Sequence, residues 1–211
     1  MSDLVLSPAE ARVLAVLVEK SMLTPQYYPM TVNAVMLAAN QKTVRNPVMS
    51  LGEGETGAAL NRLERDGLAA RDDQSGRVPK WRHRMHNQLL LKPPEVAVLG
   101  ALMLRGAQTL LELRANAQPL GGPGDAEALA ATLASLQDRA QPLVTELPRQ
   151  LGQKESRIAH LLCGPAAAAP AGVDSAPTPM HRHPGASLEQ RLAALERRVA
   201  QLEERLAHLP Q

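Results

Sequence analysis

LSPAEARVLAVLVEK at residues 6–20 and LKPPEVAVLGALMLR at residues 91–105 are two copies of one pattern, at an offset of 85 residues. Both copies place proline and glutamate where the first turn of a helix is expected, and both residue types are favourable there. Apolar residues then recur at spacings of three and four, which is typical of a helix with one buried face. The pattern therefore predicts that the chain contains two copies of one structural unit.

The segments that follow the two copies also come in the same order. After the first copy, the sequence predicts helices at about 31–40 and 53–66 and two extended segments within LAARDDQSGRVPKWRHRM. After the second copy, it predicts helices in TLLELRANA and DAEALAATLASLQDR, and a hairpin within LVTELPRQLGQKESRIAHLL. Three helices and a hairpin are the order of a winged helix-turn-helix domain. We therefore expect a mainly α fold with small β-hairpins, an α+β fold, made of tandem winged-helix domains at 1–90 and 91–164.

The C-terminal part of the chain has a different composition. Residues 165–186 are rich in alanine and proline, which predicts a disordered linker, and residues 187–211 predict a coiled-coil helix with a heptad repeat. Arginine at the g positions and glutamate at the e positions favour a parallel homodimer. A single helix packed against the core is the alternative. The residues expected to form the oligomerisation seam are Leu188, Leu192, Leu195, Val199, Leu202, Leu206 and Leu209.

Composition narrows the class of protein. The 23 basic and 21 acidic residues leave a net charge of only +2, so no charge argument applies to the whole chain. Phe is absent and there are two Tyr and one Trp, which argues against a base-stacking surface for single-stranded nucleic acid. With one cysteine, no signal peptide pattern and no apolar run of about 18 residues, we expect a cytoplasmic protein that enters no membrane.

Basic residues of the first predicted domain are candidates for contacts with double-stranded DNA. On the second extended segment, Lys80, Arg82 and Arg84 are expected to share one strand face, where they could contact phosphates. The alternative is a solvated basic edge strand that discourages aggregation. The full set of candidates comprises Arg77, Lys80, Arg82 and Arg84 in the hairpin, Asn61, Arg62 and Arg65 in the third helix, and Lys42 and Arg45 in the loop before it.

The loop NQKTVRNPVMSL, residues 40–51, carries two cations and no acid. Asn46-Pro47 predicts a turn within it. Lys42 and Arg45 either pair with Glu19 or with acids of the third helix, which is a structural role, or contact a phosphate beside the hairpin.

Little in the sequence indicates catalysis. His83 and His86, and likewise His181 and His183, lack a cysteine or carboxylate that would complete a metal site. Cys163 follows apolar residues and is interpreted as a small core residue rather than a nucleophile. We expect no enzyme activity, no cofactor and no metal. In the third helix of the second domain, small residues on the exposed face (Ala130, Ala131, Ala134 and Ser135) favour packing against another protein surface.

Longer strings resemble the YceH-like family of bacterial proteins. The similar strings are AEARVLAVLVEK (9–20), TPQYYPMTVNAV (24–35), NQKTVRNPVMSL (40–51), LMLRGAQTLLELR (102–114), KESR (154–157) and HLLCG (160–164). The resemblance implies a tandem winged-helix fold and a dimer, and it implies no catalytic residue or ligand. Two features depart from the family pattern: Val44 stands where a polar residue is usual, and Gly52, Gly54 and Gly57 stand at the start of the third helix.

Two functions follow as hypotheses. The first is a dimeric winged-helix protein that binds double-stranded DNA through its first domain, as a transcriptional regulator does. The second is a scaffold that uses its winged-helix surfaces to hold an unidentified protein partner without binding DNA.

Overall fold

The computed structural model describes residues 4–72, 78–149 and 153–164. The predicted linker at 165–186, the predicted coiled coil at 187–211 and all seven seam residues lie outside this range. In the first half of the chain the elements are α1 (Pro8–Leu23), the 3₁₀ helix η1 (Pro25–Tyr27), α2 (Val32–Ala39), α3 (Glu53–Arg65), β1 (Ala69–Asp72), β2 (Lys80–His83) and the short α4 (Met85–Gln88). In the second half they are α5 (Pro93–Arg105), α6 (Leu110–Ala117), the 3₁₀ helix η3 (Gln118–Leu120), α7 (Ala126–Gln137), β3 (Val144–Leu147) and β4 (Arg157–His160).

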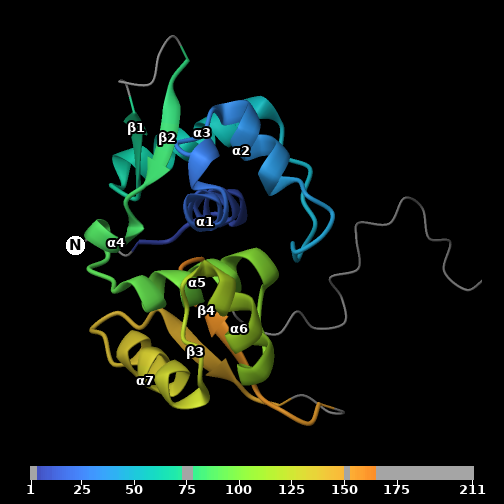
Figure 1. Cartoon of the computed structure of the whole chain (residues 1–211), viewed down its shortest axis with the longest axis vertical. Coiled ribbons are helices and arrows are strands. Elements are labelled where there is room, and N and C mark those ends of the chain that lie inside the picture. Colours follow the sequence, from blue (N-terminus) through green and yellow to red (C-terminus); the bar gives the residue numbers. More distant parts are fainter. Residues whose placement is uncertain (1–3, 73–77, 150–152, 165–211) are drawn as a thin grey trace, which may run out of the picture. The chain divides into compact units, whose positions relative to one another are not determined.

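The predicted order of three helices and a hairpin is confirmed in both halves, and the fold is a mixture of helices and two small antiparallel hairpins (Figure 1). The glutamates that match in the two copies of the sequence pattern have the same role at the starts of α1 and α5. The Glu10 carboxylate accepts from the N–H of Ser7 at 2.8 Å, and the Glu95 carboxylate accepts from the N–H of Lys92 at 2.6 Å. Each glutamate thereby satisfies a free N–H at the positive end of its helix.

The second helix of each half also begins in the same way. The hydroxyls of Thr31 and Thr109 accept hydrogen bonds from the third residue of their helices, as a side-chain cap does. The residue before each threonine forms a β-bridge to the second strand of the hairpin, Met30 with Trp81 and Gln108 with Ile158. The repeat therefore includes a bridge that ties the second helix to its hairpin.

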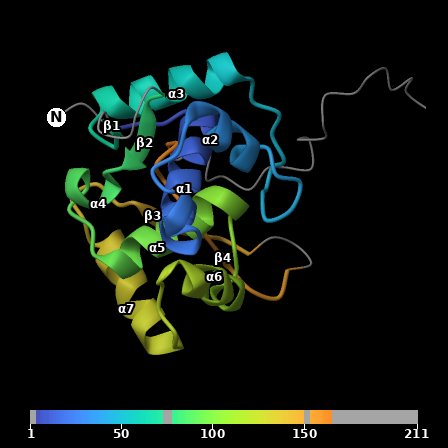
Figure 2. The same cartoon turned by 45° about the horizontal axis from the view of Figure 1, so that its top comes forward.

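The two halves share one hydrophobic core. Both α1 and α5 are buried on all sides along their central turns, which identifies them as central helices. They pack against each other, with α2, α3 and the first hairpin on one side and α6, α7 and the second hairpin on the other (Figures 1 and 2). Gly100 allows their close approach, because a Cβ there would lie 3.1 Å from a methyl group of Val18. The core therefore runs continuously from one half to the other, in one compact unit.

The apolar residues predicted to face the core are confirmed on the third helix of each half. Leu60 and Leu63 of α3 and Leu129, Leu133 and Leu136 of α7 are all buried. Because the N-cap residue of α3 is Gly52, the helix has no side-chain cap. It ends where Gly67 adopts a positive φ of 74°, a conformation that suits glycine after a helix.

Candidate interaction surfaces

The hairpin of the first half was expected to carry half of the cations that the sequence offered to DNA. Lys80 and Arg82 lie on β2, but the strand ends one residue before Arg84. The expectation that Arg84 shares their strand face is therefore wrong. Arg84 is no longer extended and lies directly before α4. Its N–H donates to the carbonyl of Leu68, the residue before β1. Arg77 lies outside the described residues.

Acids on neighbouring elements engage Arg82 and a second arginine of the hairpin, Arg71. Arg82 forms an ion pair with Asp72 of β1, the strand that runs beside it. Arg71 lies over the ring of Trp81, 5.0 Å from its centre, and reaches a carboxylate oxygen of Glu64 at 3.3 Å. The segment 77–86 contains no acid, but the partner strand supplies one. The hairpin is therefore less positive than its second strand alone.

The exposed side of α3 is also balanced in charge. Arg62 lies 3.8 Å from Asp66, and the side-chain oxygen of Asn61 accepts from Arg71 at 2.8 Å. Of the nine candidate DNA contacts, those in the described chain that form no ion pair there are Lys42, Arg65, Lys80, Arg84 and the uncharged Asn61. These free cations come from the loop, the end of α3, the start of β2 and the residue after β2, rather than from one element.

A groove of about 710 Å³ lies between the start of α1 and one side of α3. The α3 residues that line it recur at spacings of three and four, so the groove follows one side of that helix. Arg62 and Arg65 therefore lie in the same groove as Glu10 and Glu55. The full lining is Ser7, Pro8, Ala9, Glu10, Met49, Ser50, Leu51, Glu55, Ala58, Ala59, Arg62 and Arg65.

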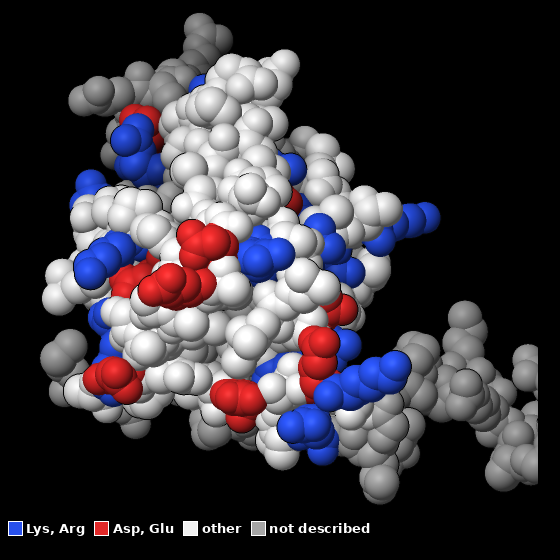
Figure 3. Space-filling view, turned by 60° about the horizontal axis from the view of Figure 1, so that its bottom comes forward, with Lys and Arg blue, Asp and Glu red and all other residues white. Residues whose placement is uncertain are grey.

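A second surface is defined by an absence of charge in the sequence. From Ser21 to Gln41, through the end of α1, η1 and α2, the chain contains no Asp, Glu, Lys, Arg or His. Figure 3 shows a broad area without charged side chains on one face of the molecule, above a region where acids and bases are mixed. The stretch exposes several large apolar side chains: Met22, Leu23, Tyr27 and Leu37.

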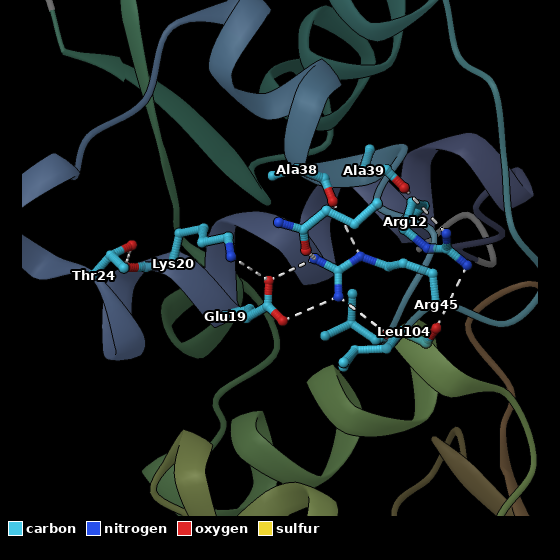
Figure 4. A network of polar contacts seen from close by, with 10 residues as sticks. Arg12, Glu19, Lys20, Thr24, Ala38, Ala39, Arg45 and Leu104 are labelled. Carbon is cyan, nitrogen blue, oxygen red and sulfur yellow. Dashed lines mark hydrogen bonds and ion pairs between the residues drawn. The ribbon is translucent and has the colours of Figure 1, made fainter.

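The loop 40–51 is built around a buried ion pair (Figure 4). Arg45 is 5 % exposed and donates to both carboxylate oxygens of Glu19, at 3.0 and 2.7 Å. Its Nε donates to the carbonyl of Ala38, in the last turn of α2, at 3.1 Å. Arg45 therefore has the structural role that pairing with Glu19 predicted, and it is not available to a phosphate. Lys42 is exposed.

A second buried cation completes this cluster. Arg12 of α1 is 1 % exposed and donates to the carbonyls of Ala39, Pro47 and Leu104, at 3.3, 2.8 and 3.5 Å. Leu104 lies in the last turn of α5, and its carbonyl also accepts from the N–H of Asn46 at 2.8 Å. The cluster thus joins the loop to the carboxyl ends of one helix from each half.

Electrostatics in this cluster favour the ionised glutamate. Burial alone would raise the pKa of Glu19, but the hydrogen bonds and charge of Arg45, together with Lys20 at 3.1 Å, hold that pKa below its usual value. Burial, and then the neighbouring charge of Arg45, lower the pKa of Arg12 to about 10. Two guanidinium groups therefore depend on one buried carboxylate.

Arg12 is the residue that sequence reasoning missed. It interrupts the apolar run of α1 seven residues before Glu19, so the two side chains lie two helical turns apart on the same side. The corresponding position of the second copy is Ala97, which is apolar. A charged residue in only one copy of a buried helix is the signal that could have identified it.

His83, His160 and Cys163 are partly buried, and burial shifts the pKa of each. Burial, and next the charge of His86, lower the pKa of His83 to about 4, and burial lowers that of His160 to about 4. Burial raises the pKa of the Cys163 thiol to about 11, so a thiolate is disfavoured there. Within residues 4–72, 78–149 and 153–164, no three His, Cys, Asp or Glu side chains gather as a metal site. The helices in these ranges are too short or too polar to cross a membrane.

The described chain is thus a mixture of helices and two small antiparallel hairpins, with one repeated order of elements in two halves that share a core and a buried loop cluster. Residues 6–153 match the family described as "Protein of unknown function, DUF480", and the chain belongs to this family.

Relatives from several bacteria align over most of the chain. The UPF0502 protein GSU0233 of Geobacter sulfurreducens is 46% identical over 162 residues, which are 77% of this chain and 74% of the relative. A UPF0502 protein of Pelobacter propionicus is 48% identical over 162 residues, with the same coverage of both chains. The UPF0502 protein mll4256 of Mesorhizobium japonicum is 46% identical over 186 residues, 88% of each chain.

Proposed function

We propose that the chain is a cytoplasmic protein-interaction module built from two winged-helix units, as the resemblance to YceH-like proteins implies. Its working site is the groove beside α3, and its partner presents a helix there. The observation that carries the proposal is the composition of the groove, whose lining combines small and apolar residues with charges of both signs.

The apolar lining of the groove suits an approaching helix. Ala58 and Ala59 are consecutive small residues of α3 that leave room for another backbone, while Met49 and Leu51 supply apolar contacts. From Glu55 to Arg65 the lined side of α3 is about 15 Å long, which is nearly three helical turns. An amphipathic helix laid in a groove makes contacts with this spacing.

The charged residues of the groove select against DNA. Glu10 and Glu55 would face phosphates with like charge, and Arg62 is already close to Asp66. A partner helix with a basic residue facing the two glutamates and an acidic residue facing the two arginines would satisfy all four charges. Charge of both signs therefore favours a protein over a polyanion.

The test compares Ala58→Arg with Leu111→Arg in the full chain. Ala58 and Leu111 are both exposed on helices, so both variants should fold, but only the first blocks the groove. We expect proteins that purify with the wild-type chain from cells to be retained by Leu111→Arg and lost from Ala58→Arg. Identical sets of proteins with all three chains would refute the groove as the site.

Binding of double-stranded DNA is the second candidate, favoured by the free cations Lys80 at the start of β2 and Arg84 directly after it. A duplex of about 25 base pairs at about 50 mM salt tests it by fluorescence anisotropy. Affinity that falls at least tenfold in Lys80→Ala with Arg84→Ala, but not in Arg82→Ala, would support DNA binding over the scaffold. The Arg82 variant is the matched control, because that side chain is held by Asp72.

A further inference from the structure

The uncharged stretch from Ser21 to Gln41 presents large apolar groups to solvent. Tyr27 is 75% exposed, Leu37 62% and Met22 51%. Each CH₂ group left in water rather than buried forgoes about 0.8 kcal/mol, and large exposed apolar groups that gather on one surface mark interaction sites. Lys20 and Lys42 are the first charged residues on either side of the stretch, so it is bounded by charge and free of it inside.

This surface is held in place by the fold. The Tyr28 hydroxyl accepts from the N–H of His83 at 2.6 Å, and Met30 exchanges two backbone hydrogen bonds with Trp81, at 3.0 and 2.7 Å. The cap at Thr31 then starts α2 immediately after this bridge. The exposed side chains therefore project from anchored backbone, and a partner that binds them loses little conformational freedom.

The lack of charge indicates which partner fits. In an interface with two-fold symmetry, residues near the axis meet their own copies, so each charge there would face a like charge. A surface with no charge avoids this repulsion, whereas a partner recognised by opposite charge would find no group to pair with. Tyrosine, methionine and leucine also supply the apolar centre that homodimer interfaces have.

We infer that the surface formed by Met22, Leu23, Tyr27 and Leu37 is the contact between two copies of this chain, packed about a two-fold axis. The inference is independent of the groove, whose lining shares no residue with this surface. The predicted parallel coil would support the same association, because it would raise the effective concentration of one surface near the other.

Two measurements on the full chain test the contact. In the first, light scattering compares the wild type with Tyr27→Glu plus Leu37→Glu, and with the control Leu111→Glu on α6. Leu111 is 65% exposed, and Tyr27 and Leu37 are exposed to a similar extent, so all three chains should fold. We expect a dimer dissociation constant at least tenfold weaker for the Tyr27 and Leu37 variant, and an unchanged constant for the control. A wild-type chain that is monomeric at about 100 μM would overturn the inference.

The second measurement detects the contact even where the coil alone keeps two chains together. In a Cys163→Ser background, Leu37→Cys and the control Leu111→Cys are treated with a short bis-maleimide. Cross-linked dimer should form at least five times faster through position 37. Equal rates would overturn the inference whatever the mass of the particle.

Discussion

Removal of either partner of the buried Arg45–Glu19 pair should destabilise the chain strongly, and removal of the glutamate should cost at least as much as removal of the arginine. Arg45→Ala takes away both hydrogen bonds to Glu19 and leaves the carbonyl of Ala38 without its side-chain donor. The 4% exposed Glu19 then keeps only the contact with Lys20. A buried charge left in this way typically costs about 3–5 kcal/mol.

Glu19→Gln acts on the other side of the pair. It removes the single carboxylate that stabilises Arg45, and Arg12 then meets the charge of Arg45 without a compensating anion. Arg45→Ala, by contrast, relieves Arg12 of a neighbouring cation. We therefore expect a loss of about 4–5 kcal/mol for Glu19→Gln, against about 3–4 kcal/mol for Arg45→Ala.

Urea denaturation at pH 7, followed by circular dichroism, measures both free energies of unfolding. Lys20→Met is the matched control, since its side chain is partly exposed at 19% and its loss should cost at most about 1 kcal/mol. The double variant Arg45→Met with Glu19→Met should recover much of the stability, because it leaves no buried charge of the pair. A loss below about 1 kcal/mol for either single variant, or a double variant no more stable than the less stable single variant, would refute this reasoning.

Three further predictions concern stability. Gly54→Ala should stabilise the chain by about 0.5–1 kcal/mol, because a Cβ there meets nothing within 4 Å and alanine is the better helix former; an unchanged midpoint in urea would contradict it. Val44→Asn should raise the midpoint by an amount equivalent to about 1 kcal/mol, because Val44 holds a positive φ of 63° that a β-branched residue disfavours; a lower midpoint would show that its side chain matters more. His83 and His160 have folded pKa values of about 4, below the usual 6.5, so the unfolded chain binds more protons between these pH values. The free energy of unfolding should therefore fall from about pH 6.5 to about pH 4, by at most about 3 kcal/mol for each histidine. His160→Gln should flatten this pH profile.

Sequence reasoning identified the features that depend on neighbouring residues. The capping threonines Thr31 and Thr109 and the leucines of α3 and α7 could be assigned because caps and helical spacing are local. Pairing across the fold could not be assigned in the same way. Asp72 comes to Arg82 only when β1 and β2 form a hairpin, and Arg12 meets three carbonyls that lie 27 to 92 residues further along the chain.

The candidate sites differ in the same respect. Pairing of Arg45 with Glu19 was one of the alternatives that the sequence offered, because a basic loop needs an acid, and it is the one that the structure shows. The groove was not apparent, since its lining comes from the start of α1, the end of the loop and α3. Arg62 and Arg65 looked like contacts for bases because their neighbours across the groove could not be known from helical spacing alone.

The hydrogen bond from Asn46 to the carbonyl of Leu104 makes the two halves of the molecule mechanically dependent. The loop that follows α2 in the first half contacts the last turn of α5, the central helix of the second half. Arg12 donates to a carbonyl at the end of each of these two helices. A displacement of α5 would therefore pull on α2, and through the bridge between Met30 and Trp81 it would reach the first hairpin. Under a load applied to one half, the two halves should therefore move together rather than independently.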